Sequence, residues 1–159
     1  MEVQNESAEI RLDQKVKVRS IAPWYTGSAR KTTNGDISIP PMGSILLSRE
    51  EIISQAQNGN KLLTGIDGVG NHATWYIEDS YTRKELSFDS ESESQQFLTQ
   101  DTIKKMFDLK TQKAFENQIQ NSVVTRAEKA YLIESIKSLK LNDYQKIAFC
   151  ISYTGMKMD

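Results

Sequence analysis

Apolar and polar residues alternate along much of the first half of the chain, a pattern that predicts β-strands. Between Lys15 and Ile21, valines alternate with lysine and arginine, which favours a strand with one buried face. Asn34-Gly35 suits the positive φ angles of a tight hairpin turn, and isoleucines alternate at 37 and 39 directly after it. Further short strands are expected at 45–47, 62–63, 72–78 and 83–88.

One short helix is expected among these strands. Ser48 and Glu51 have the spacing of a capping box, in which the Ser48 hydroxyl accepts from the Glu51 amide and the Glu51 carboxylate accepts from the Ser48 amide. The apolar residues at 52, 53 and 56 form its buried face, and Asn58-Gly59-Asn60 is suited to end it. The first half therefore predicts a small β-barrel or sandwich of five or six strands with one short helix.

After residue 98 the apolar residues recur every three or four positions, which is the spacing of an amphipathic helix. Threonine, aspartate or asparagine precedes each such segment, and these side chains cap helices by accepting hydrogen bonds from free backbone amides. Gly155 is suited to end the last helix, so the second half predicts a helical bundle. The expected caps are Thr99 or Asp101, Thr111, Thr125 with Glu128 in a capping box, and Asn142.

An acidic, serine-rich stretch separates the two patterns. Residues 89–96 read Asp-Ser-Glu-Ser-Glu-Ser-Gln-Gln and hold no apolar side chain, a composition typical of linkers. The sequence therefore predicts an α+β fold in which a β-rich part precedes a helical part. The expected divisions are a flexible N-terminal segment at 1–14, a β-rich module at 15–88, an acidic hinge at 89–98 and a helical module at 99–159.

Composition places the chain among globular proteins, with 38% hydrophobic and 26% charged residues in a length of 159. Its 20 basic and 21 acidic side chains give a net charge of −1, so no global field attracts nucleic acid or an anionic membrane. Cys150 is the only cysteine, which excludes an intrachain disulfide and a thiolate metal cage and fits a reducing compartment. The sequence has no recognisable signal peptide or membrane-spanning run, so we expect a cytoplasmic protein without a membrane partner.

The loop at 65–71 holds three glycines, and closely spaced glycines let backbone amides approach a phosphate. A phosphate-binding P-loop needs Gly-Lys-Ser/Thr at the start of a helix, whereas a predicted strand follows this loop. We therefore favour a hairpin connection over a ligand loop, while Gly68 and Gly70 stay candidate binding residues.

His72 is the only histidine and the main candidate for proton transfer. No second histidine or neighbouring cysteine completes a metal site around it. Catalysis needs a carboxylate that orients the imidazole, and the nearest in sequence are Asp67, Glu78 and Asp79. We therefore expect no metal and no other cofactor, and we predict that the protein is not an enzyme.

Aromatic and cationic residues of the first half have the chemistry of a surface on which bases stack. The same residue types also build ordinary β cores, and we favour a core or a protein interface. A small-ligand or nucleic-acid binding site therefore stays as the alternative function. The candidate ligand-binding residues are Trp24, Tyr25, Arg30, Gly68, Gly70, His72, Trp75 and Arg83.

The stretch from Ile39 to Asp79 runs from Ile-Pro-Pro-Met-Gly-Ser-Ile-Leu-Leu through Leu-Leu-Thr-Gly-Ile-Asp-Gly to Trp-Tyr-Ile-Glu-Asp. It is similar to small structural proteins of tailed bacteriophages, over about a quarter of the 159 residues. The resemblance implies a virion component, such as a capsid auxiliary, connector or fibre-attachment protein. It assigns no functional residue.

The leading expectation is thus a non-enzymatic assembly protein that contacts other structural proteins through its two modules and forms homo- or hetero-oligomers. Such a protein is cytoplasmic when made and is later part of a virion. A small-ligand or nucleic-acid binder is the alternative, and a hydrolase centred on His72 comes third.

Overall fold

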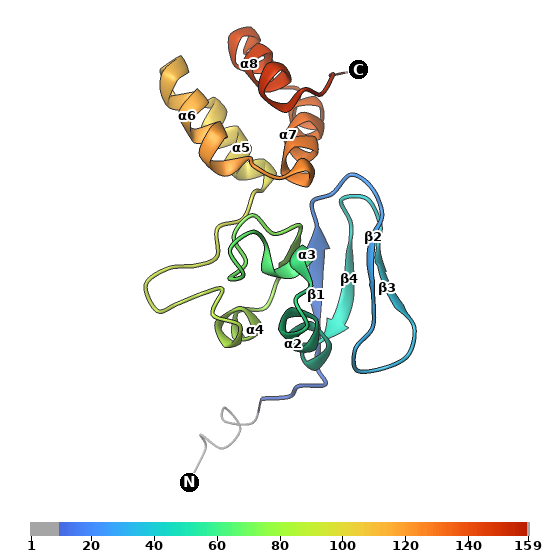
Figure 1. Ribbon diagram of the computed structural model, residues 1–159. Helices are drawn as coiled ribbons and strands as arrows, with labels where there is room; N and C mark the ends of the chain where they lie inside the picture. The colour runs from blue at the N-terminus through green and yellow to red at the C-terminus, as the bar shows by residue number, and fades with distance from the viewer. Residues whose placement is uncertain (1–9, 159) are drawn as a thin grey trace.

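The computed structural model describes residues 10–158 and confirms the α+β class. Antiparallel strands in two small sheets, with short helices, form the first half, and packed helices form the second (Figure 1). Most of the segment expected to be flexible, 1–14, lies outside the described residues. Its described part is bonded to the start of helix α2 (Arg49–Gln57), because the Leu12 carbonyl accepts from the Glu50 amide at 2.9 Å.

The larger sheet has three antiparallel strands, in the order β4 (Ser44–Ser48), β1 (Lys15–Ser20) and β5 (Trp75–Ile77). Val18 lies at its centre, opposite Ile45 of β4 and Ile77 of β5. Val18 is fully buried whereas Lys17 is exposed, because successive side chains of a strand point to opposite faces. The strand predicted from alternation in this part of the chain is confirmed.

The smaller sheet is a hairpin of β2 (Thr26–Ala29) and β3 (Asp36–Ile39). The predicted hairpin is confirmed, but its turn is wider than a tight Asn-Gly turn, because residues 30–35 form the loop and only Gly35 of the pair has a positive φ, of 103°. The Gly35 carbonyl accepts from the Arg30 amide at 2.9 Å. The sequence does not predict β2, because Thr-Gly-Ser-Ala has no apolar alternation. β2 pairs with β3, whose isoleucines are buried in the apolar core that both sheets share.

Three short helices accompany these sheets: α2 (Arg49–Gln57), α3 (Lys61–Thr64) and α4 (Ser80–Glu85). The strands predicted at 62–63 and 83–88 are wrong, because these residues lie in α3, or in α4 and the turn after it. Asn60 and Asp79 start the two helices by accepting hydrogen bonds from amides of the first turn. The cap side chains therefore decide the local structure where the apolar pattern alone suggests a strand.

Glu51 of α2 is almost fully buried and holds the β2–β3 hairpin. Ser48 accepts from the Glu51 amide at 3.1 Å, as predicted, but the second half of the capping box is wrong. The Glu51 carboxylate accepts instead from the Lys31 and Thr32 amides, the Thr32 hydroxyl and the Gln55 side chain. Burial alone would raise the pKa of Glu51, but these hydrogen bonds lower the pKa to about 2.

The second half consists of α5 (Gln100–Phe107), α6 (Gln112–Ser122), α7 (Arg126–Leu139) and α8 (Tyr144–Thr154). Their apolar faces meet around Phe115, Ile119 and Cys150, which are fully buried. This arrangement confirms the predicted helical part. Within residues 10–158, no helix is long and apolar enough to cross a membrane.

The threonine caps predicted for three of these helices are confirmed at Thr99, Thr111 and Thr125. The predicted cap of α8 is one residue too early. Asp143, and not Asn142, accepts from an amide of the first turn. Asp and Asn are both good caps, so composition alone does not separate the two positions. Gly155 ends α8 in the left-handed conformation, as expected.

A buried lysine joins α8 to the end of α5. Lys146 is 8% exposed, and its Nζ donates to the Phe107 and Leu109 carbonyls at 2.6 Å each. Free carbonyls and the helix dipole favour a cation at a helix C-terminus. The carboxylate of Asp143 lies 3.5 Å from Nζ, and the ring of Phe115 lies 5.5 Å away. The buried ammonium group of Lys146 is therefore surrounded by two carbonyl acceptors, a carboxylate and an aromatic ring.

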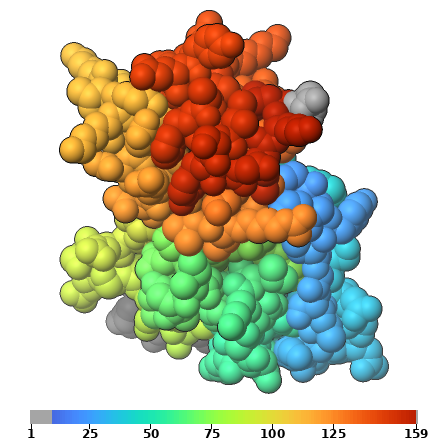
Figure 2. Space-filling model, turned by 45° about the horizontal axis from the view of Figure 1, so that its top comes forward, coloured from blue at the N-terminus to red at the C-terminus, as the bar shows by residue number. Residues whose placement is uncertain are grey.

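The two halves contact each other directly. Ile21 and Ala22, which follow β1, pack with Ala127 of α7 in a small apolar cluster. Phe97 stacks on Tyr76 of β5, with ring centroids 4.1 Å apart. Figure 2 shows the start of α7, in orange, against the green residues of the first half. The helical part is therefore packed on the β-rich part.

Segment 89–98 has no regular secondary structure, but it is fixed to the β-rich half. Buried Asp89 pairs with Arg83 at 2.8 Å and accepts from the Gln95 amide at 2.7 Å. The Gln95 side chain in turn donates to the Gly70 carbonyl at 2.7 Å. The acidic and serine residues at 90–94 are exposed between these two attachment points.

Replacing Glu51 with Gln should lower the free energy of unfolding by about 2 kcal/mol at pH 7, because an amide cannot accept from all these donors. The pKa of Glu51 is about 2 when folded against a usual value of 4.5. Its contribution is therefore present above pH 4.5 and is lost as the pH falls towards 2. Urea titrations at several pH values measure the effect. The exposed neighbour Glu50→Gln is the control, and an equal loss in both variants contradicts the prediction.

Replacing Lys146 with Met should lower the free energy of unfolding by about 2–3 kcal/mol, because two carbonyls at the end of α5, one of them in a buried hydrogen bond, lose their donor. The matched change Lys113→Met, on the exposed surface of α6, should cost less than about 0.5 kcal/mol. Urea denaturation monitored by circular dichroism compares the two. Similar midpoints for both variants would show that the buried lysine is dispensable.

Candidate functional site

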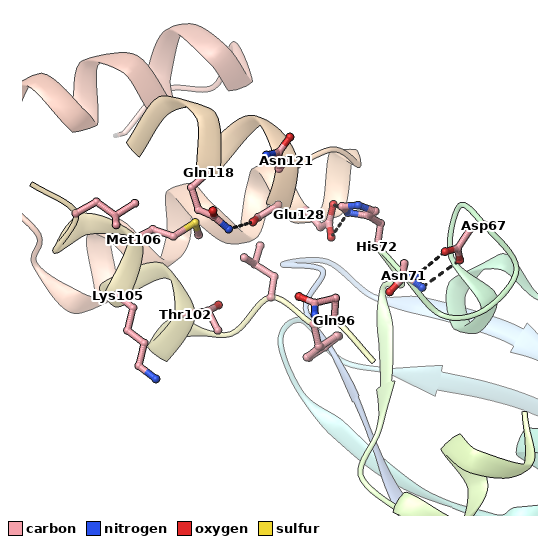
Figure 3. A pocket seen from close by; sticks show the side chains of 14 residues that line it. Asp67, Asn71, His72, Gln96, Thr102, Lys105, Met106, Gln118, Asn121 and Glu128 are labelled. Atoms are coloured by element: carbon pink, nitrogen blue, oxygen red, sulfur yellow. Dashed lines mark hydrogen bonds and ion pairs between the residues drawn. The ribbon is translucent and has the colours of Figure 1, made fainter. Parts of the chain in front are cut away.

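A cleft of about 670 Å³ opens between the two halves. Its walls come from the loop before β5, from residues 96–98, and from α5, α6 and α7 (Figure 3). Ligand pockets usually measure about 300–1,000 Å³, so the cleft has the size of a binding site. The lining residues are Asp67, Asn71, His72, Gln96, Phe97, Leu98, Thr102, Lys105, Met106, Leu109, Gln118, Asn121, Ser122 and Glu128.

His72 and Glu128 form a hydrogen bond in the wall of this cleft (Figure 3). Nδ1 of His72 lies 3.0 Å from Oε1 and 3.1 Å from Oε2 of Glu128, although the residues are 56 positions apart in the chain. The Glu128 side chain is 4% exposed and that of His72 is 27% exposed. A buried carboxylate of the second half therefore orients an accessible imidazole of the first half.

The start of α7 fixes the position of Glu128. Glu128 is the third helical residue, where it forms the predicted capping box with Thr125. Its Oε1 accepts from the Val124 amide at 2.9 Å and from the Thr125 amide at 3.0 Å. The capping box is therefore confirmed, and the carboxylate that completes it also binds His72.

The carboxylate of Asp67 holds the loop that carries His72. It accepts from the Val69 amide at 2.9 Å, and from the backbone and side-chain amides of Asn71 at 3.3 and 2.5 Å. Burial alone would raise the pKa of Asp67, but these hydrogen bonds hold the pKa below its usual value. His72 itself has a φ of 60°, in the left-handed region that few residues with side chains adopt. The imidazole is thus carried by a residue whose backbone is strained.

The loop at 65–71 connects α3 to β5, so the predicted hairpin between two strands is wrong. Its three glycines have φ angles of 73°, 85° and 90°, which let the chain turn tightly. The Gly70 amide donates to the Thr64 carbonyl and the Ile66 amide to the Asn71 carbonyl. These amides, like those bonded to Asp67, face partners in their own loop and not a phosphate. The glycines therefore position His72.

Of the candidate ligand-binding residues, His72 alone lines the cleft. Trp75 is fully buried and its Nε1 donates to the Thr26 hydroxyl at 2.7 Å, so its ring belongs to the β core. Arg83 pairs with Asp89 and also donates to the Ile77 carbonyl. Trp75 and Arg83 therefore hold the fold together, and neither is available to a ligand in the cleft.

The other candidates are divided among the junction, the hairpin and the glycine loop. Trp24 packs at the junction, where the Arg126 guanidinium lies 4.9 Å from its ring. Tyr25 is 71% exposed, and Arg30 bonds across the hairpin turn. Gly68 is exposed in its loop, whereas the buried Gly70 packs close to Phe88 and Gln95.

The lining of the cleft combines apolar surface with polar side chains, most of which are uncharged. Four of its side chains are carboxamides, each with one acceptor and two donors: Asn71, Gln96, Gln118 and Asn121. Leu98 and Met106 are buried and give the cleft an apolar floor. Lys105 is exposed on α5 and lies 3.4 Å from Asp101, one helical turn away.

Metal and thiol chemistry have no support in the part of the chain that the structure describes. Residues 10–158 contain no group of three or more His, Cys, Asp or Glu side chains that could hold a metal ion. Cys150 is buried, as its place on the apolar face of α8 predicts. Burial raises the pKa of the Cys150 thiol to about 12, so it is protonated and unreactive near neutral pH.

The sequence points to His72 but not to its partner. Of the carboxylates nearest in sequence, Asp67 bonds its own loop, and Glu78 and Asp79 pair with arginines. Glu128 is recognisable only as part of a capping box, which gives no sign of a second hydrogen bond. The polar residues of α5 and α6 in the cleft have the pattern of ordinary exposed positions of amphipathic helices.

The fold and the cleft define an α+β protein with a ligand-sized cleft between a β-rich and a helical half. Compared with protein-family models, curated proteins and solved structures, the chain matches none.

Replacing Gly70 with Ala should destabilise the protein by about 3 kcal/mol, because a Cβ would lie 2.6 Å from Gln95 Nε2 and 2.8 Å from the Phe88 ring. Gly68→Ala is the matched control. It has a similar positive φ but no atom within 4 Å of its Cβ, so it should cost only about 1 kcal/mol. Thermal unfolding of the two variants tests the difference. Equal losses would mean that the packing of this loop against residues 88–95 contributes nothing.

Proposed function

We propose that the protein is a non-enzymatic binding protein that receives a short segment of a partner protein in the cleft between its halves. The observation that carries the proposal is the lining of the cleft, where carboxamide and apolar side chains surround one cavity. The partners are other structural proteins, and the complex is a homo- or hetero-oligomer.

The carboxamides match the chemistry of a peptide backbone. Each peptide unit offers one N–H donor and one carbonyl acceptor, and Asn or Gln side chains can pair with both. The floor formed by Leu98 and Met106 can take one apolar side chain of the segment. A nucleic acid fits less well, because the lining carries the carboxylates of Asp67 and Glu128 against one lysine.

The cleft supports binding better than catalysis. A hydrolase centred on His72 needs a nucleophile activated by its free ring nitrogen. The two hydroxyls in the cleft have other partners, since Ser122 accepts from Gln118 at 3.0 Å and Thr102 donates to the Thr99 carbonyl at 2.8 Å. Neither hydroxyl is bonded to the imidazole in the described residues, which favours the non-enzymatic reading.

The likeness of residues 39–79 to small structural proteins of tailed bacteriophages suggests where to look for the partner. Under this proposal the segment belongs to another virion protein, and the protein is made in the cytoplasm before assembly. Two halves that pack across a cleft offer a bound segment contacts from both sides, which strengthens its binding.

Selection from a displayed peptide library tests the proposal. Wild-type protein should enrich uncharged segments with an apolar residue, and Asn121→Trp should weaken their binding at least about tenfold because the indole fills the cleft. Gln120→Trp is the control, since Gln120 is also exposed on α6 but does not line the cleft. Calorimetry with the synthetic peptides measures affinity.

Two results would contradict the proposal. One is a selection that enriches no peptide over an unrelated protein. The other is a set of peptides that bind the Asn121→Trp and Gln120→Trp variants equally well, which would place the binding surface outside the cleft.

A further inference from the structure

We infer that His72 determines the specificity of the cleft: its Nε2 accepts a hydrogen bond, so the bound segment must carry an N–H or O–H donor at that point. This inference rests on the proposed function, because it concerns the ligand of the same cleft. It identifies the chemical group that the segment has to present.

The hydrogen bond to Glu128 fixes the tautomer of the imidazole. Nδ1 of His72 lies 3.0 and 3.1 Å from the two carboxylate oxygens of Glu128. Oε1 already accepts from two backbone amides, of Val124 and Thr125. Because Oε1 is the acceptor of both amide bonds, Nδ1 of His72 at 3.0 Å is a further donor to it. In neutral imidazole the proton on Nδ1 leaves Nε2 as the acceptor.

The second ring nitrogen of His72, Nε2, is free to accept a hydrogen bond from a ligand. No hydrogen bond joins Nε2 to another group of residues 10–158, and Nε2 is not among the buried polar atoms that lack a partner. The side chain is 27% exposed and lines the cleft. Nε2 is therefore an accessible acceptor, held in place by a buried carboxylate.

Two of the carboxamides of the cleft are less selective than the imidazole. The side chains of Asn71 and Gln118 already donate to Asp67 and Ser122. The carboxamides of Gln96 and Asn121 have no hydrogen bond within residues 10–158 and can turn over, so each can meet either a donor or an acceptor. The imidazole cannot do this without breaking its bond to Glu128. A segment that brings an acceptor to Nε2 leaves two lone pairs facing each other, which costs affinity. His72 thus discriminates between segments that Gln96 and Asn121 tolerate alike.

The tautomer can be measured directly, because the chain has a single histidine. In protein labelled with ¹⁵N at histidine, long-range ¹H–¹⁵N spectra at pH 8 should show Nδ1 protonated and Nε2 unprotonated. Glu128→Gln should reduce this preference, since an amide group can also donate to Nδ1. A wild-type spectrum with the proton on Nε2 would overturn the inference without any ligand.

A double-mutant cycle tests the contact itself. His72→Asn is suited to it, because the Asn amide nitrogen is as many bonds from Cα as Nδ1 and can still donate to Glu128, while Nε2 is deleted. Asn also tolerates the left-handed backbone at this position. The probe is the most enriched synthetic peptide from the library selection, with each backbone N–H methylated and each side-chain donor removed in turn.

Removal of one particular donor from the peptide should lower its affinity for the wild-type protein about tenfold. The same removal should leave its affinity for the His72→Asn variant unchanged. If every donor removal has the same effect on both proteins, His72 does not select the ligand and the inference fails, although the cleft still binds peptides. If no peptide is enriched at all, the proposed function fails, and the spectra still decide the tautomer.

Discussion

A carboxylate that is withdrawn from water has to be given hydrogen-bond donors, and the packing of the two halves meets this constraint at Glu128. Two donors are amides at the start of its own helix, and the third is the imidazole of His72 in the other half. Moving the halves apart would leave the carboxylate short of a donor. Its burial therefore makes the local capping box part of the tertiary structure.

The same constraint operates at two further places. Glu51 gathers donors from the β2–β3 hairpin, so a helix fixes a turn that has few apolar residues of its own. Lys146 is the opposite case, a buried cation that donates hydrogen bonds to the carbonyls at the end of α5. In each case a buried charge replaces apolar packing where the chain is irregular. The protein positions its loops with a small number of charged groups.

Features that depend on a few neighbouring residues are predictable from the sequence. Alternation identifies β1, and threonine caps identify α5, α6 and α7, because both signals are local. The segments α3 and β2 escape prediction, since a single cap side chain decides the first and pairing with a neighbour decides the second. The cleft is out of reach for the same reason. Only the folded chain brings His72 against Glu128 and into one cleft with the carboxamides of α6.

The exposed residues at 90–94 lie between Asp89 and Gln95, which are bonded to each other and to the β-rich half. The ends of this segment are therefore held by their side chains as well as by the backbone between them. A cut within these residues interrupts the backbone but leaves both anchors and the stacked rings of Tyr76 and Phe97 in place. The two fragments of such a nicked protein would still have every noncovalent contact that joins them.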